Sequence, residues 1–201
     1  MAQNIVIDGI VLAAGTSTRM GQPKPLLEVD GTPFLERAIK LLRHAGCRYV
    51  IAVVNDSDDW IARLADANGA EPVINDQPDS EQIDSLRLGI ANLPDGYDAI
   101  IVLPVDFPRV QPETVSALLA EFQQHPVAVL NPAFDGKPGH PVIFSRDVVA
   151  ELLRPDLPNG ARTVIDRHLA EAKTLNVPDA GVLIDIDTPA DFEDHVKGST
   201  R

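Results

Sequence analysis

The sequence has little of several things that would point to particular classes of protein. Its 201 residues include one cysteine, 4% aromatic residues and only 17 lysines and arginines against 30 acids, a formal net charge of -13. A single cysteine excludes an internal disulfide and is typical of a reducing compartment. The acidic balance argues against a nucleic-acid partner, because phosphate backbones are bound by clustered cations.

Long apolar runs are also missing. No stretch reaches the roughly 18 residues of a membrane span, and no charged-then-apolar leader is visible. We therefore expect a cytoplasmic protein with no membrane partner. The hydrophobic content of 44% is ample for a sizeable core, so we expect one domain over residues 1–196 and a frayed tail at 197–201.

Hydrophobic periodicity alternates between the strand and the helix pattern. Strands are predicted at 5–12, 49–54, 71–74, 98–103, 126–130, 141–144, 173–177 and 182–186. Helices are predicted at 34–45, 58–67, 82–93, 112–122, 148–153, 161–169 and 190–196, with Thr32 as N-cap of the first. This βαβ rhythm predicts an α/β fold with a largely parallel sheet.

Small residues and two spaced cations follow the first apolar run, in the segment 12–24. A loop after a parallel strand lies at the carboxyl edge of the sheet, where α/β proteins bind ligands. The small residues at 13–15 let phosphates approach backbone N–H groups, and Arg19 and Lys24 add positive charge. The segment predicts a nucleoside triphosphate site; the alternative is an ordinary turn whose Arg and Lys form surface salt bridges.

Three carboxylates stand where strands are predicted to end. Asp106 follows the strand at 98–103, and Asp185 and Asp187 follow Gly181-Val-Leu-Ile184 at the end of the strand predicted at 182–186. Mg²⁺ typically takes one or two carboxylates together with substrate phosphates, so Asp106 and one of the other two would suit it. The alternatives are a turn-forming Asp106 and helix capping by the later pair.

Five segments together resemble the MobA-like nucleotidyltransferase family, and within it the cytidylyltransferases of the molybdenum cofactor (MocA type). In chain order they are Leu12-Ala-Ala-Gly-x-Ser-x-Arg-Met-Gly-x-x-Lys24, Ser85-Leu-Arg-Leu-Gly89, Pro104-Val-Asp106-x-Pro108, Gly139-His140-Pro141 and Asp185-Ile-Asp-Thr-Pro-x-Asp191. The resemblance covers nearly the whole chain. It implies a three-layer α/β sandwich with a doubly wound, mostly parallel mixed sheet, whose N-terminal half binds the nucleotide and whose C-terminal half binds the acceptor.

The resemblance also implies a reaction and its residues. A phosphate of the acceptor would attack the α-phosphorus of the nucleoside triphosphate, with Mg²⁺ as cofactor and pyrophosphate as leaving group. The implied backbone contacts to the nucleotide are at Leu12, Ala13, Ala14 and Gly15.

Side-chain roles are implied in the same way. Arg19 and Lys24 match the catalytic cations that hold the triphosphate, and Ser85 matches a position near the base or ribose. Asp106 matches the principal Mg²⁺ ligand, and Asp187 is preferred to Asp185 as the second carboxylate. For His140 two roles stay open, a contact to the acceptor or a backbone hydrogen bond that pins its turn.

Departures from the family pattern leave the acceptor and nucleotide open. Residues 79–84 lack the Gly-x-Ser-Ser pattern, and Pro25 follows Lys24 as in sugar-phosphate uridylyltransferases. By the same resemblance, Ala14 stands where guanylyltransferases of this type have a second glycine, which favours a pyrimidine nucleotide over GTP. The expected acceptor is a molybdopterin-type cofactor, with a sugar phosphate as rival. A different class is a module that binds nucleotide without transfer and delivers a cofactor to a molybdoenzyme or chaperone.

Overall fold

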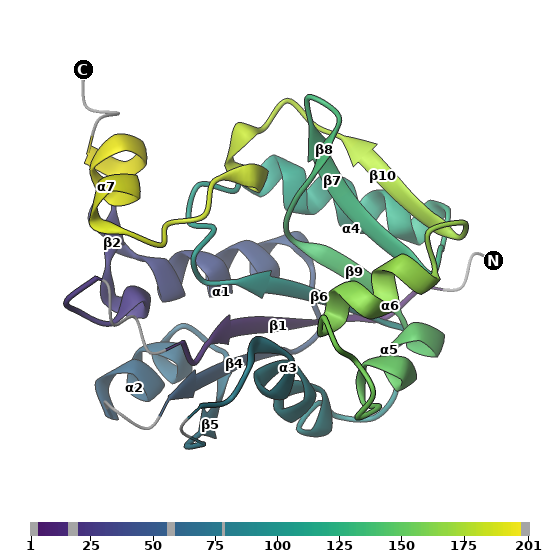
Figure 1. Ribbon diagram of the computed structural model, residues 1–201, viewed down its shortest axis with the longest axis horizontal. Coiled ribbons are helices and arrows are strands. Elements are labelled where there is room, and N and C mark those ends of the chain that lie inside the picture. Colours follow the sequence, from purple (N-terminus) through teal and green to yellow (C-terminus); the bar gives the residue numbers. More distant parts are fainter. Residues whose placement is uncertain (1–3, 16–19, 56–58, 78, 198–201) are drawn as a thin grey trace.

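The fold is a three-layer α/β sandwich built on one mixed sheet, seen in the computed structural model in Figure 1. The structure describes residues 4–15, 20–55, 59–77 and 79–197. These residues form an eight-stranded sheet of order β10-β7-β9-β6-β1-β4-β5, with β8 paired to β7. The strands are β1 (Ile7–Ala13), β4 (Val50–Asn55), β5 (Glu71–Asn75), β6 (Ala99–Pro104), β7 (Val129–Phe134), β8 (Lys137–Pro138), β9 (Val142–Ser145) and β10 (Ala172–Asn176).

Helices cover both faces of this sheet (Figure 1). One layer holds α1 (Phe34–Ala45), α2 (Asp59–Ala67) and α4 (Pro112–Gln124). The other holds α3 (Gln82–Ala91), α5 (Arg146–Leu152) and α6 (Ala161–Arg167). Successive residues of β1 feed the two layers alternately: Val11 packs in the first and Ile10 and Leu12 in the second, which explains why the central strands are apolar throughout.

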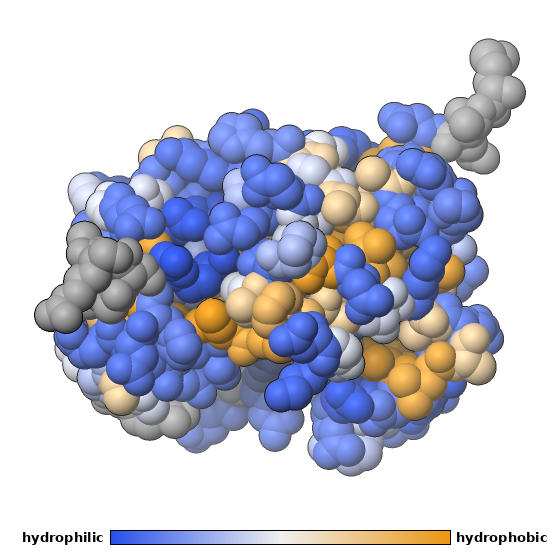
Figure 2. All heavy atoms as spheres, turned by 90° about the horizontal axis from the view of Figure 1, so that it is seen from above, coloured by the Kyte–Doolittle hydropathy of each residue, from blue (hydrophilic) through white to orange (hydrophobic). Residues whose placement is uncertain are grey.

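Shorter elements complete the chain. A two-stranded sheet joins β2 (Glu28–Val29) to β3 (Thr32–Pro33). The 3₁₀ turns are η1 (Lys24–Leu26) and η2 (Ala180–Leu183), and the chain closes with α7 (Pro189–Phe192) and the π-helical turn η3 (Glu193–Lys197). None of the helices formed by the described residues has both the length and the apolar character that a membrane crossing requires. Seen from above, the surface is mostly hydrophilic, with apolar residues gathered in a band across its middle (Figure 2).

The parallel part of the sheet decides where the loops meet. Strand β1 lies between β4 and β6 and is parallel to both, and β5 extends the parallel set. Their carboxyl ends therefore share one edge, where the segments after β1, β5 and β6 come together. Helix α3 packs close to this set because Gly89 has no side chain; a Cβ there would stand 2.9 Å from Ile10 Cγ2. That close approach brings the first turn of α3 to the same edge.

Two sequence-based expectations are wrong. Residues 182–186 are not a strand: the 3₁₀ turn η2 ends at Leu183, and an extended segment without sheet partners follows. The run Val182-Leu-Ile184 is apolar because it packs against the sheet and the loop after β6, and periodicity over so few residues does not separate the two cases. Thr32 belongs to β3, and the N-cap of α1 is Pro33, which offers no side-chain cap. Most other boundaries differ by one to four residues.

Candidate nucleotide-binding site

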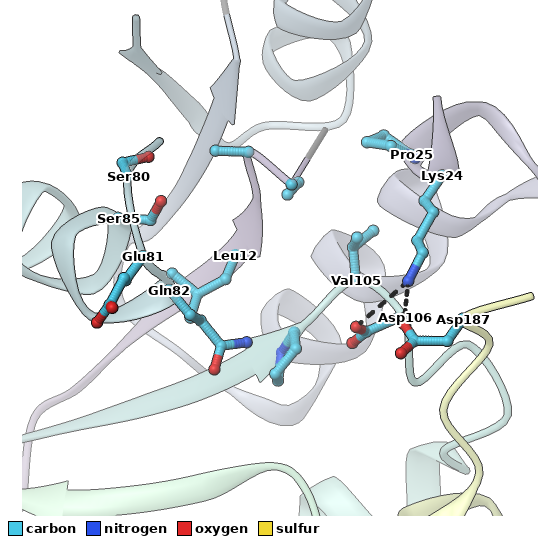
Figure 3. A pocket seen from close by; sticks show the side chains of 14 residues that line it. Leu12, Lys24, Pro25, Ser80, Glu81, Gln82, Ser85, Val105, Asp106 and Asp187 are labelled. Atoms are coloured by element: carbon cyan, nitrogen blue, oxygen red, sulfur yellow. Dashed lines mark hydrogen bonds and ion pairs between the residues drawn. The ribbon is translucent and has the colours of Figure 1, made fainter. Parts of the chain in front are cut away.

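A cleft of about 260 Å³ opens at the carboxyl edge of the parallel strands (Figure 3). Its walls come from the ends of β1 and β6, from η1, from the first turn of α3 and from the segment before α7. The lining residues are Leu12, Ala13, Ala14, Gly15, Lys24, Pro25, Ser80, Glu81, Gln82, Ser85, Pro104, Val105, Asp106 and Asp187. Residues far apart in the sequence therefore converge here, including the segment after β1 and the carboxylate after β6.

Lys24 lies between two carboxylates at one end of the cleft (Figure 3). Its Nζ is 3.7 Å from Asp106 Oδ2 and donates a hydrogen bond to Asp187 Oδ1. Lys24 opens η1, whose second residue, the buried Pro25, fixes the direction of the turn. The side chain of Lys24 thus extends from η1 to the carboxylate that follows β6.

The carboxylate of Asp106 has its own backbone N–H and the Lys24 ammonium near it, but one of its oxygens is unfilled. Its Oδ1 is buried and has no hydrogen-bond partner among the described residues. Burial raises the pKa of the Asp106 carboxyl, and the nearby Lys24 ammonium opposes that shift. The expected alternative, a carboxylate that serves only to form a turn, does not account for this unfilled oxygen, because a turn-forming side chain spends its oxygens on backbone N–H groups.

Asp187 reaches the cleft through a braced segment. The N–H of Ile186 donates to the backbone carbonyl of Asp106 at 2.8 Å, which ties the segment to the end of β6. The cap of α7 is Thr188, which forms a capping box with Asp191, so the side chain of Asp187 is not needed for capping. Asp185 is exposed and does not line the cleft. The structure therefore brings Asp187, and not Asp185, beside Lys24 and Asp106.

Two serines line the opposite end of the cleft (Figure 3). Ser85 is buried in the first turn of α3, and Ser80 precedes that helix. Both hydroxyl oxygens accept hydrogen bonds from Asn75 Nδ2, at 2.9 Å for Ser85 and 3.0 Å for Ser80. Asn75 was missed at the sequence level; its only signal is a polar residue directly after the predicted strand at 71–74.

A second cavity of about 520 Å³ adjoins the cleft and shares four of its residues, Leu12, Glu81, Gln82 and Pro104. Most of its other walls are apolar and come from β6, β9, α6 and β10. Arg162 is the one cation among the described lining residues, and its Nε already donates to Asp166 at 2.8 Å.

His140 lines the second cavity. Its backbone N–H donates a hydrogen bond to the carbonyl oxygen of Val182 at 3.0 Å, which holds the turn in place. Its ring packs on the ring of Phe107, with 4.5 Å between the centroids. Nδ1 is buried without a hydrogen-bond partner among the described residues. Burial lowers the pKa of His140 to about 4, so the ring is neutral near pH 7.

One predicted residue, Arg19, lies outside the described residues. Among those described, the cleft holds one cation, Lys24, against the carboxylates of Glu81, Asp106 and Asp187. No group of three or more His, Cys, Asp or Glu side chains arranged for a metal ion occurs within the described residues. A divalent cation at Asp106 and Asp187 would therefore take its remaining ligands from water or from substrate oxygens.

Comparison with known protein families decides what this architecture belongs to. A family model described as MobA-like NTP transferase domain matches residues 9–172. The chain belongs to the MobA-like NTP transferase family. The resemblance expected from the five sequence motifs is thereby confirmed.

Two curated relatives of this MobA-like chain differ in the nucleotide that their names carry. The chain is 38% identical over 120 residues to a molybdenum cofactor guanylyltransferase of Xanthomonas euvesicatoria, a match that covers 60% of this chain and 57% of that protein. It is 24% identical over 189 residues to the molybdenum cofactor cytidylyltransferase of Escherichia coli, which covers 92% of this chain and 93% of the relative.

A solved structure matches the whole fold. The crystal structure of Rv0371c from Mycobacterium tuberculosis superposes with a TM-score of 0.81 at 27% identity, covering 97% of this chain and 99% of that one. The same mycobacterial protein has also been solved in complex with manganese, and that structure matches with a TM-score of 0.79 at 26% identity, over 96% of this chain and 98% of the other. The expected α/β sandwich is confirmed.

Proposed function

We propose that the protein transfers CMP from CTP to a phosphorylated small molecule, a molybdopterin-type cofactor, and releases pyrophosphate. One observation carries this proposal: Lys24, Asp106 and Asp187 meet at one end of a cleft whose floor is the backbone after β1. The names of two relatives, both molybdenum cofactor nucleotidyltransferases, support the acceptor class.

The chemistry joins two anions. An oxygen of the acceptor phosphate forms a bond to the α-phosphorus, the bond from that phosphorus to its bridging oxygen breaks, and pyrophosphate leaves with the electron pair. The attacking phosphate is already ionised near pH 7, so no general base is required. The protein must instead supply positive charge and position. Lys24 supplies such a charge, and the backbone at Ala14 and Gly15 can supply N–H donors.

The carboxylates fit a divalent cation. The buried Oδ1 of Asp106 is a hard oxygen ligand with no hydrogen-bond partner among the described residues. Asp187 lies on the other side of Lys24 from Asp106. These two residues would hold Mg²⁺, which when bound neutralises charge on phosphate oxygens. Without a cation, three carboxylates and one lysine among the described residues would repel a triphosphate.

Two features support the assignment of substrates to the two hollows. The nucleotide belongs in the cleft with Lys24, and the acceptor in the adjoining cavity, because the shared residues Gln82 and Pro104 form the junction where both would react. Ala14 favours a pyrimidine nucleotide over GTP, and the relative that spans the chain, a cytidylyltransferase, favours CTP. GTP is the second candidate, favoured by the higher identity to the guanylyltransferase.

The test is a matrix of pyrophosphate release. The four nucleoside triphosphates are each combined with Mg²⁺ and with a molybdopterin-type acceptor or a hexose 1-phosphate. We expect release with CTP and the molybdopterin-type acceptor, loss of release with EDTA, and no release by the Asp106→Asn variant. Release with GTP alone would show that GTP, and not CTP, is the substrate. Release with the hexose phosphate alone would show that the acceptor is a sugar phosphate. Tight CTP binding with no release in any well would contradict transfer and favour the non-catalytic module.

A further inference from the structure

The ammonium group of Lys24 takes the space between the two carboxylates of the cleft (Figure 3). Its Nζ lies 3.7 Å from Asp106 Oδ2 and donates a hydrogen bond to Asp187 Oδ1. The lysine side chain is 15% exposed and that of Asp106 is 25% exposed, so water screens this ion pair only in part. A cation that both carboxylates share has to lie between them, in the space that Nζ fills.

The lysine compensates the two carboxylates incompletely. One ammonium group brings a single positive charge to two negative ones, and Asp106 Oδ1 has no hydrogen-bond partner among the described residues. A divalent cation carries a second charge and prefers a shell of oxygen ligands, so it would compensate both carboxylates. The same cation would repel an ammonium group held between its ligands, because like charges in a partly buried site are poorly screened.

A movement of the side chain is enough to take the Lys24 ammonium away. The main chain is held, because the carbonyl of Lys24 accepts from the N–H of Leu27 at 3.0 Å and the buried Pro25 follows in η1. The side chain itself is a flexible aliphatic stem that ends in a point charge. The backbone of Ala14 and Gly15 lines the same cleft, so a triphosphate bound there would compete with the carboxylates for the ammonium.

We propose that Lys24 occupies the cation position between Asp106 and Asp187 until nucleotide arrives, and so makes metal binding depend on nucleotide binding. This rests on the proposed function, which places a triphosphate in this cleft. Without nucleotide, the metal binds only those molecules in which the ammonium has left, and its apparent affinity falls by that fraction. A triphosphate that draws the ammonium away removes this penalty. By thermodynamic linkage, the metal raises the affinity for nucleotide by the same factor.

The first test measures metal binding to the protein without nucleotide. Mn²⁺ is the probe, because the electron paramagnetic resonance signal of the free ion falls as the ion binds. Lys24→Met keeps an unbranched side chain and removes the ammonium, and we expect it to bind Mn²⁺ at least about tenfold more tightly than the wild type. The titrations are made in about 0.5 M KCl, which screens the effect of overall charge. Lys24→Gln, also uncharged, gives the same comparison if Lys24→Met does not fold.

Two further variants show whether the gain comes from this position. Lys40→Met is the matched control, because it removes the same charge from an exposed lysine that pairs with Glu36 on α1, and it should bind Mn²⁺ as the wild type does. In Lys24→Met/Asp187→Asn the metal has lost one of the two carboxylates, so the gain should disappear. Circular dichroism on each preparation confirms that the variants are folded.

The second test measures the linkage. CTP binding is followed by calorimetry without acceptor, once with Mg²⁺ and once with EDTA, and the ratio of the two dissociation constants is the readout. Binding of Mg²⁺ to free CTP is common to all the variants and cancels when their ratios are compared. Mg²⁺ should strengthen CTP binding by a larger factor in the wild type than in Lys24→Met, even though the variant binds CTP more weakly overall.

Failure of this inference is distinct from failure of the transferase proposal. Mn²⁺ binding that Lys24→Met leaves unchanged or weakens overturns the inference even if CMP transfer is observed. A gain that Lys40→Met reproduces, or that persists in Lys24→Met/Asp187→Asn, overturns it as well, because the effect would then not come from the space between the carboxylates. A gain confined to Lys24→Met, with the smaller Mg²⁺ effect on CTP, supports it even if no acceptor in the pyrophosphate matrix yields product.

Discussion

Asp8 and Asp106 belong to neighbouring strands but lie at opposite ends of them, Asp8 near the start of β1 and Asp106 just after the end of β6. The two carboxylates differ in how many of their oxygens have hydrogen-bond partners. Asp8, near the start of β1, is fully buried, and both its oxygens are filled. Arg48 donates to it from Nε at 3.0 Å and from Nη2 at 2.6 Å, and the N–H of Tyr49 adds a third hydrogen bond at 3.2 Å. Asp106, beyond the end of β6, has one buried oxygen without a partner and a lysine 3.7 Å from the other.

The difference separates stability from function. Asp8 ties β1 to the start of β4 and gives up its hydration for three hydrogen bonds, which is how a structural carboxylate tolerates burial. The Asp106 carboxylate loses hydration without full compensation by hydrogen bonds, which lowers the stability of the fold. A bound cation would offset that cost, as is typical of functional sites. The first arrangement predicts an effect on unfolding, and the second predicts an effect on substrate turnover.

The largest expected effect is on turnover at Asp106. Asp106→Asn keeps the shape of the side chain and removes the charge, so pyrophosphate release should fall about 1000-fold in kcat/KM. The free energy of unfolding should stay the same or rise, because a poorly solvated charge is removed. Steady-state kinetics and urea titration of the same preparation check both parts. A fully active variant, or one that loses stability and not activity, would contradict the assignment of Asp106 to turnover and of Asp8 to stability.

The second effect is on stability at Asp8. Asp8→Asn places an NH₂ group at a fully buried position where both carboxylate oxygens accept hydrogen bonds, so one donor faces another and the free energy of unfolding should fall by about 3 kcal/mol. The folded variant should keep kcat/KM within about twofold, because Asp8 is at the opposite end of the sheet from the cleft. Urea titration gives the first quantity and pyrophosphate release well below the melting temperature gives the second. An inactive but stable variant would contradict the assignment.

The third prediction separates the two later carboxylates. Asp187→Asn should lower kcat/KM about 100-fold, since Asp187 lines the cleft and accepts from Lys24. Asp185→Asn is the matched control two residues away, where the exposed side chain lies outside the cleft lining, and it should stay near wild type. The apparent affinity for Mg²⁺, measured from the metal dependence of release, should weaken in the first variant only. Equal losses of kcat/KM in the two variants would contradict the assignment of Asp187, and not Asp185, to the cleft.

The smallest effect concerns His140, whose buried Nδ1, like Asp106 Oδ1, has no hydrogen-bond partner among the described residues. Its pKa in the folded protein is lowered to about 4 from an ordinary value of 6.5, so the unfolded chain takes up the proton first as pH falls. The stability linked to the neutral ring is complete above about pH 6.5 and is lost between there and about pH 4.

His140→Gln cannot take up that proton. The difference in unfolding free energy between the two proteins should be constant above pH 7 and should shift by about 1 to 2 kcal/mol in favour of the variant by pH 5. Thermal and urea unfolding across this range provide the measurement. A difference that is flat down to pH 4 would show that the ring is not held neutral by the fold.

Much of the fold was accessible from the sequence because its causes are local. The buried strands and amphipathic helices of the first 130 residues follow from the spacing of apolar residues, and the loop after β1 follows from its small residues and Lys24. The strand expected at 182–186 was wrong, because an apolar run of that length also suits a turn packed on a sheet. The preference for Asp187 over Asp185 came from the family resemblance, and the contact of Asp187 with Lys24 is a feature of the structure alone.

The sequence by itself determined the class of fold, the family and the kinds of side chain present at the cleft. Only the tertiary structure decided how those side chains are used: that Asp106 keeps an unfilled oxygen while Asp8 has none, that Asp187 and not Asp185 meets Lys24, and that Asn75 donates to two serines of the cleft. Periodicity and loop chemistry are properties of neighbouring residues. Hydrogen-bond satisfaction and polarity depend on groups up to 163 positions apart, such as Lys24 and Asp187, which meet only when the sheet is assembled.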